Sequence, residues 1–392
     1  MANNMRYSAL KKPLFFSFIF LVYSYLFYKN VHICRRYGIL YNMYQHSEFA
    51  KDWLKGVFIS HPGFHILTII VAKSTGCSFI NAALALHIVF TVITAFMVYK
   101  VLWINLRDKY SENVVLLSTA FLLLVIAIYI PGFSWNMYLG QGNPNMVNSP
   151  TLTATKPFML LSILFFINLL TSKTSKDILR NSCILSITLL ISVFMKPCFA
   201  YVFIPAMAIY LLWKQTRNIK LYIYSICIIA PAIIVIMWQA YNMLLGSGPG
   251  YSTTVEINPF YVWRTVSPNI PISILLATAF PVVVFLLRPK NAIRNTGLVI
   301  SWLMVIIGIL EYALLMEGEP KTFSYNWMWG YNLALLPLFI FSAIEFLTLY
   351  KDPKPKRNLL KTGMVFAGVI FLLHFASGIA YFYRLLNCGP FI

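Results

Sequence analysis

The stretch HSEFAKDWLKGVFISHPGFH, residues 46 to 65, gathers side chains that could carry out proton transfer. It holds three of the chain's six histidines and two of its eleven carboxylates, namely His46, His61, His65, Glu48 and Asp52. A carboxylate can accept the proton of a hydroxyl group, and a histidine can orient that carboxylate or face a phosphate. If residues 46 to 56 are helical, the two acids share one face because they are four residues apart. We therefore predict that Glu48 or Asp52 is a catalytic base.

Each of these residues also has a simpler structural interpretation. The two acids could pair with Lys51 and Lys55 on a solvated helix, and the histidines could anchor an amphipathic helix among lipid headgroups. Glu48 is the better candidate for the base because both lysines lie beside Asp52. The six cysteines show no paired or metal-ligand spacing, so we expect neither a disulfide nor a zinc site. No cofactor is required, although an acid pair with a histidine could hold a divalent cation.

Three other segments, 132–156, 245–270 and 317–329, are rich in asparagine, glycine, proline and aromatic residues. Amides and acids hydrogen-bond hydroxyl groups, aromatic rings cover the apolar faces of sugars, and cations pair with phosphate. Turn formation and an aromatic belt at the membrane surface are the alternative explanations for the asparagines and tryptophans. With the three histidines, the predicted substrate-binding residues are Asn143, Asn145, Asn148, Lys156, Lys196, Arg264, Glu317, Glu319, Lys321, Asn326 and Trp329.

The elements that must position these residues cross a membrane. A chain with 59% hydrophobic and 11% charged residues does not form a soluble globule, and its long apolar runs match the length of a bilayer-spanning helix. We expect one all-α integral membrane domain over residues 1–392, with no soluble domain. The eleven predicted spans are 13–28, 78–102, 114–131, 157–172, 182–196, 198–213, 221–244, 271–287, 296–316, 330–350 and 362–383.

The basic residues predict the orientation of the chain. The N-terminal segment and the even-numbered connections carry 20 of the 31 lysines and arginines, and positive residues mark the cytoplasmic side. The N-terminus is then inside and the C-terminus outside. The net charge of +20 does not indicate a nucleic-acid partner, because the basic residues form no patch with stacking aromatics.

Two apolar segments need special placement. Residues 58–73 are hydrophobic enough to span, but a crossing there would invert every later loop, so we expect an interfacial helix within a long outer loop, 29–77. Residues 182–213 predict a short helical hairpin broken by Pro197, which turns below the outer surface. Lys196 would then be an intramembrane cation, and such residues are functional candidates unless they only snorkel to the interface.

This arrangement resembles the GT-C superfamily of polytopic glycosyltransferases. The architecture is similar, and HSEFAKDWLKG, SHPGFH, NPNMVNSPTLTATKPF, KPCFAYVFIPA and EGEPKTFSYNWMWG look like segments of bacterial multi-span proteins of surface-polysaccharide pathways. Enzymes of this superfamily commonly place an acid soon after the first span. Residues 29 to 47 contain none, so Glu48 or Asp52 would fill that role.

The resemblance implies transfer of a sugar from a polyprenyl-(di)phosphate-linked donor to a glycan or lipid-linked acceptor, on the outer face of a bacterial cytoplasmic membrane. The expected partners are the lipid-linked donor, the glycan acceptor and membrane lipids. A transporter or flippase, or a polymerase of lipid-linked oligosaccharide, is the alternative. A transporter should show internal repeats and polar residues near the midplane of several spans. Here no repeat is evident, and the charged candidate site residues lie at the outer side.

Overall fold

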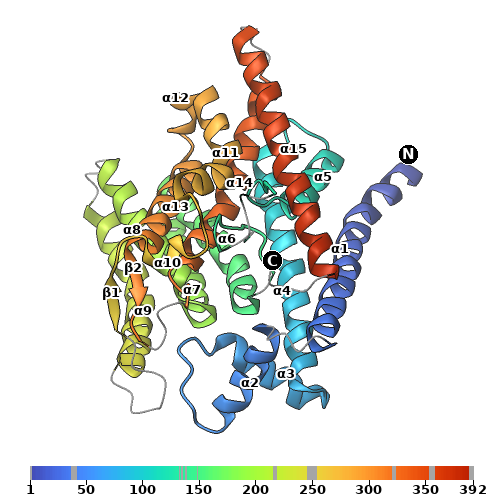
Figure 1. Cartoon of the computed structure of the whole chain (residues 1–392). Helices are drawn as coiled ribbons and strands as arrows, with labels where there is room; N and C mark the ends of the chain where they lie inside the picture. Colours follow the sequence, from blue (N-terminus) through green and yellow to red (C-terminus); the bar gives the residue numbers. More distant parts are fainter. Residues whose placement is uncertain are drawn as a thin grey trace.

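The computed structural model describes residues 2–36, 42–131, 133, 136, 139–147, 149–214, 219–244, 254–319, 324–352 and 358–387. Its long helices run roughly alongside one another and form a single bundle (Figure 1). The helices are α1 (Ala2–Arg36), α2 (Asn42–Leu54), α3 (Gly63–Thr75), α4 (Phe79–Leu106), α5 (Glu112–Leu122), α6 (Pro150–Thr171), α7 (Ser175–Met195), α8 (Cys198–Trp213), α9 (Ile219–Leu244), α10 (Tyr261–Arg264), α11 (Ile270–Leu287), α12 (Pro289–Ala292), α13 (Thr296–Leu314), α14 (Met328–Tyr350) and α15 (Asn358–Asn387).

Within the described residues, nine helices are long and apolar enough to cross a membrane. They are α1, α4, α6, α7, α9, α11, α13, α14 and α15. Helix α14 lies at the centre, where nearly all of its first eighteen residues are buried, while α1, α9 and α15 expose apolar side chains along one face. This pattern suits a polytopic protein, because lipid can cover exposed apolar faces that water would not. The all-α polytopic class is confirmed.

Two of the eleven expected spans are not among the nine. Helix α8 has 16 residues, and α5 ends at Leu122, well before the expected boundary at 131. After α5 the chain continues as buried, non-helical backbone whose polar groups find partners elsewhere: the Ile128 amide donates to the Leu276 carbonyl, and the Asn145 side-chain amide donates to the carbonyls of Leu122 and Val125. Such a conformation is stable at membrane depth only when the protein supplies these partners.

Helices α2 and α3 form a helix–turn–helix at the end of the bundle opposite the N-terminus (Figure 1). Helix α3 has 13 residues and is not among the nine candidate spans, and its location at the membrane interface stays a prediction. Gly63 begins α3 where a Cβ atom would lie 2.9 Å from the Phe194 carbonyl oxygen, so glycine allows α3 to pack against the end of α7. Phe64 is fully buried against Met43 and other side chains of the bundle.

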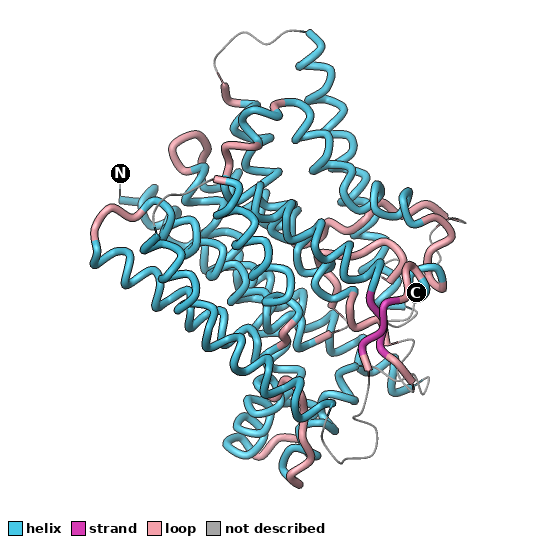
Figure 2. Tube along the Cα trace, turned by 90° about the vertical axis from the view of Figure 1, so that its left-hand side faces the viewer, coloured by secondary structure: helices cyan, strands magenta, loops and turns pink. Residues whose placement is uncertain are grey.

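A two-stranded antiparallel sheet joins two loops that are distant in sequence. Strand β1 (Val255–Ile257) pairs with β2 (Leu315–Glu317), with Val255 opposite Glu317. The pair lies at one edge of the helical body (Figure 2). The pairing fixes the position of Glu317 directly after α13, outside the candidate spans.

Close packing of α13 on α14 sets the position of the loops beyond them. A Cβ atom at Gly308 would lie 2.6 Å from the Tyr331 amide nitrogen, and a Cβ atom at Gly330 would lie 3.0 Å from a Glu311 carboxylate oxygen. Tyr312 and Tyr331 then donate hydrogen bonds to the carbonyls of Leu139 and Gln141. The two helices therefore hold the segment 139–147 against the bundle.

Candidate functional site

His46, His61 and His65 come together as a histidine cluster between α2 and α3. The His46 Nδ1 and His65 Nε2 atoms are 2.9 Å apart, and the two rings stack with their centroids 5.1 Å apart. The His61 ring lies 6.2 Å from that of His65, and its Nδ1 is 2.8 Å from the Ser60 hydroxyl. His65 is fully buried and its Nδ1 has no hydrogen-bond partner among the described residues.

The histidines of this cluster are neutral at pH 7. The pKa of His65 is lowered to about 4, chiefly by burial and also by the nearby Lys196 charge, while the backbone of His61 acts in the opposite direction. Burial also lowers the pKa of His46 and of His61 well below the usual value, with the neighbouring histidines and Lys196 acting in the same direction. A negatively charged ligand beside the cluster would reverse the effect of Lys196 and favour the protonated rings.

Lys196 lies next to this cluster, in the turn between α7 and α8. It is only 9% exposed, and its ammonium group sits 4.4 Å from the centre of the Trp329 ring and 3.4 Å from the Ser149 hydroxyl. No ion pair joins Lys196 to a carboxylate among the described residues. A buried charge without a counter-charge is costly, so Lys196 is a strong candidate for contact with an anionic ligand.

Ser149 places this lysine at the beginning of α6. It caps the helix, with its hydroxyl accepting from the Leu152 amide at 3.4 Å, and Pro150 occupies the first turn. The N-terminus of a helix also carries a partial positive charge that suits an anion. One candidate anion-binding site, which we call the Lys196 site, is therefore formed by Lys196, the start of α6 and the histidine cluster. Its chemistry suits a phosphate.

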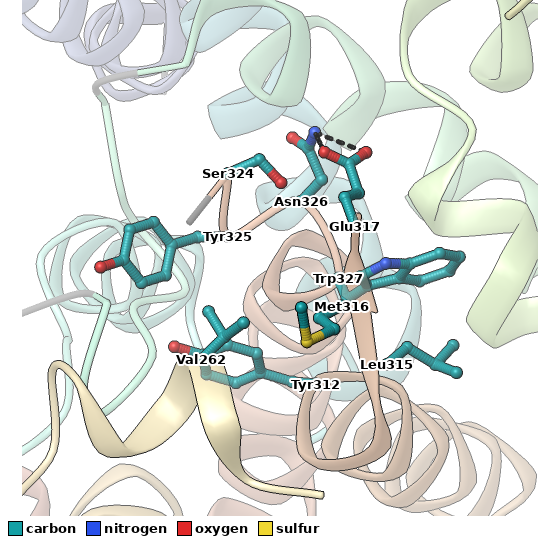
Figure 3. Close-up of a pocket in the computed structure, with 9 residues that line it drawn as sticks. All are labelled: Val262, Tyr312, Leu315, Met316, Glu317, Ser324, Tyr325, Asn326 and Trp327. Carbon is teal, nitrogen blue, oxygen red and sulfur yellow. Dashed lines mark hydrogen bonds between the residues drawn. The ribbon is translucent and has the colours of Figure 1, made fainter. Parts of the chain in front are cut away.

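On the other side of Trp329 lies a carboxylate. The Trp329 indole donates to the Asn326 side-chain oxygen at 3.1 Å, and the Asn326 amide donates to both carboxylate oxygens of Glu317 at 3.1 Å. Glu317 is 8% exposed and lines a narrow pocket, which we call the Glu317 pocket (Figure 3). Its lining residues are Val262, Tyr312, Leu315, Met316, Glu317, Ser324, Tyr325, Asn326 and Trp327.

The two acids predicted as the base stand apart from this arrangement. The Glu48 side chain is 60% exposed and pairs with Lys51 at 2.7 Å, while Asp52 is 37% exposed and pairs with Lys55 at 3.2 Å. This is the geometry of surface ion pairs on α2. The catalytic assignment of Glu48 or Asp52 stays a prediction.

The other predicted residues divide into three groups. Asn143 and Asn145 are buried. The Asn143 side-chain oxygen accepts from the backbone amide of Asn145, and the backbone amide of Asn143 donates to the side-chain oxygen of Asn332. Arg264 and Glu319 are exposed near the β-sheet, with the Arg264 guanidinium 5.8 Å from the Phe260 ring centre. Asn148 and Lys321 lie outside the described residues.

Lys156 forms part of a second, separate pocket. It is buried one and a half turns into α6, where it lines a small polar pocket with Tyr23, Thr94 and Asn145 among others. His87 lies nearby, with its Nε2 3.1 Å from the hydroxyl of Thr153. No ion pair to a carboxylate involves Lys156 among the described residues.

Sequence reasoning missed Ser149 and Glu311. A serine directly before a proline that opens an apolar run is a helix-capping signal, and it would have placed Ser149 at the start of α6. Glu311 is an acid within an apolar span, a pattern that indicates a functional candidate. Its carboxylate approaches Gly330 at the contact of α13 with α14.

Within the described part of the chain, no group of three or more His, Cys, Asp or Glu side chains has an arrangement that could hold a metal ion.

These features define the class of the protein. The apolar helices identify a multi-pass membrane protein, with its polar site at the end of the bundle that carries α2 and α3. No protein-family model and no curated protein sequence matches the chain.

Proposed function

We propose that the protein is a membrane glycosyltransferase of the GT-C type, which transfers a sugar from a polyprenyl-(di)phosphate donor to a glycan or lipid-linked acceptor. One observation carries the proposal: Lys196 is a buried cation beside the start of α6, with no carboxylate partner among the residues that the structure describes. The phosphate of a lipid carrier would supply the missing negative charge. The proposed location is the outer face of a bacterial cytoplasmic membrane.

The surroundings of Lys196 suit a phosphate leaving group. When a glycosyl phosphate bond breaks, negative charge develops on the phosphate oxygens, and fixed positive groups stabilise that charge. The ammonium of Lys196 and the positive end of the α6 dipole are already in place.

The test measures release of the carrier lipid from a panel of polyprenyl-phosphate sugars by detergent-purified protein. Lys196→Met removes the charge but keeps an aliphatic side chain of similar length, so turnover should fall by roughly 10² or more, the effect of losing one group that stabilises transition-state charge. Lys73→Met is the matched control, because Lys73 is exposed at the end of α3 and should leave turnover within about twofold.

Normal turnover by the Lys196→Met variant would remove the main support for this function. Binding of the lipid donor without release of the carrier, together with movement of the donor between the leaflets of a vesicle, would instead favour the transporter alternative.

A further inference from the structure

The eleven carboxylates of the chain are all described, and most are already neutralised. Ion pairs with lysine or arginine involve Glu48, Asp52, Asp108, Glu112, Asp177 and Asp352. Glu256 and Glu319 are exposed. Buried acids without an ion pair are therefore few, and they are the ones whose charge calls for an explanation.

Position within the bundle separates the remaining acids. Glu345 is buried near the far end of α14, about 25 Å along the helix from the end that carries Trp329. Glu311 lies within α13, where its carboxylate packs near Gly330. Glu317 alone is buried, lines a pocket and lies beyond the end of a candidate span.

Asn326 holds the Glu317 carboxylate in one orientation. Its amide nitrogen lies 3.1 Å from each carboxylate oxygen, so both oxygens are oriented by a single donor group (Figure 3). A carboxylate held in one orientation can be placed for proton transfer from a bound hydroxyl group. The β1–β2 pairing fixes the backbone that carries it.

Trp329 connects the Glu317 carboxylate with the Lys196 site. The Asn326 side-chain oxygen accepts a hydrogen bond from the Trp329 indole, and the Lys196 ammonium lies over the face of the same indole. Among the described residues, neither the buried Lys196 nor the buried Glu317 forms an ion pair, and both are connected to one tryptophan: Lys196 lies over its ring face, and Glu317 is reached through Asn326 at its indole N–H. Ligands that place a phosphate at Lys196 and a hydroxyl group at Glu317 would satisfy both.

We propose that Glu317 is the general base that accepts the proton of the acceptor hydroxyl, an inference that rests on the proposed transferase function. The acceptor oxygen forms a bond to the anomeric carbon of the donor sugar while the bond from that carbon to the phosphate oxygen breaks. The electron pair of the broken bond leaves with the polyprenyl phosphate, and the hydroxyl proton moves to the Glu317 carboxylate.

The Glu317 pocket also indicates the kind of acceptor. Tyr325 and Trp327 offer aromatic surface beside the carboxylate, and the Trp327 indole nitrogen is buried without a hydrogen-bond partner among the described residues. This combination suits an uncharged sugar, whose hydroxyls accept and donate hydrogen bonds and whose ring packs on aromatic faces.

The experiment compares Glu317→Gln with Glu256→Gln and Glu48→Gln. Glutamine keeps the shape and hydrogen bonding of glutamate but is no base, so Glu317→Gln should lower turnover by roughly 10² to 10⁴. Glu256→Gln is the matched control on the neighbouring strand, at an exposed position opposite Met316, and should turn over within about twofold of the wild type. Glu48→Gln tests the competing prediction that Glu48, an exposed ion-pair partner, is the base.

Two further measurements separate a base from a structural residue. Polyprenyl phosphate without a sugar should bind Glu317→Gln as tightly as it binds the wild type, which also shows that the variant is folded. The fall in kcat/KM at acid pH should be present in the wild type and absent from the residual activity of Glu317→Gln, since that fall reports protonation of the base.

The outcomes distinguish the assignment of Glu317 as the base from the proposed transferase function on which it rests. Normal turnover by Glu317→Gln, or a large loss of turnover in Glu48→Gln alone, would overturn the assignment of Glu317 as the base. The proposed transferase function would be unaffected by either result. Failure of the wild-type protein to release carrier from any donor would overturn the proposed function and the base assignment together.

Discussion

At the scale of single residues, the histidine cluster has a consequence for stability. His65 is fully buried, and Lys196, His46 and His61 are the titratable groups that face it. Its pKa of about 4 lies below the value near 6.5 of an unfolded chain, so below pH 6.5 the unfolded state binds more protons than the folded one. Stability is therefore greatest above about pH 6.5 and falls as the pH is lowered toward 4.

Unfolding of the purified protein, followed across this pH range, tests that consequence. The loss attributable to His65 amounts to about 3 kcal/mol at most, and His65→Gln should make the pH dependence shallower because it removes the titrating ring. His32→Gln, which replaces an exposed histidine of α1, should leave the wild-type dependence unchanged. Identical curves for the wild type and His65→Gln would contradict the prediction.

At the scale of the elements, the contact of α13 with α14 positions Tyr312, Trp329 and the start of β2. Small residues allow such close approach between membrane helices. The structure has no room for a side chain at Gly308, because its neighbour is the rigid Tyr331 backbone. The separation of these two helices thus controls how the Glu317 pocket is built.

Gly308→Ala should push the two helices apart and lower the free energy of unfolding by about 1–3 kcal/mol, the range for overpacking. Gly368→Ala, in α15, is the control, because a Cβ atom there meets nothing within 4 Å and alanine favours helix. Thermal unfolding of both variants in detergent provides the measurement. Equal stability of the two variants would show that α14 can shift without cost.

At the scale of the whole molecule, the predicted orientation assigns the two ends of the bundle to opposite sides of the membrane. The N-terminus, α12 and the start of α15 lie toward one end of the bundle, and α2 and α3 lie at the other (Figure 1). Basic residues are concentrated in the connections at the first end, as expected for a cytoplasmic face. The candidate site would then face outward.

Labelling of single cysteines by a membrane-impermeant thiol reagent tests this orientation in intact cells. In a background without the native cysteines, Glu256→Cys and Glu319→Cys should react from outside, and Lys176→Cys and Lys290→Cys only after the membrane is opened. These four positions are exposed. Position 143, which the sequence indicated as an accessible outer site, is fully buried and is unsuitable for labelling. Outside labelling of Lys176→Cys would invert the orientation and place the site in the cytoplasm.

Much of the architecture could be predicted from the sequence, because it depends on local properties of the chain. Long apolar runs give membrane helices, Pro197 ends α7, and Pro62 with Gly63 separates α2 from α3. The early end of α5 was not predictable, because the partners of the following backbone, such as Leu276, are distant in sequence.

The site itself was decided by the tertiary structure. The sequence placed Lys196, Asn326 and Trp329 among the substrate-binding residues, but it could not connect them, since Lys196 and Trp329 belong to different helical segments. It favoured Glu48 because acids and histidines stand together there, whereas packing turns Glu48 outward and buries Glu317 beside Asn326. The physical reason is that a helix apolar on every face, such as α14, carries no local signal for which face points inward. Close contacts at glycines and pairing of distant strands set that rotation, and they exist only in the folded molecule.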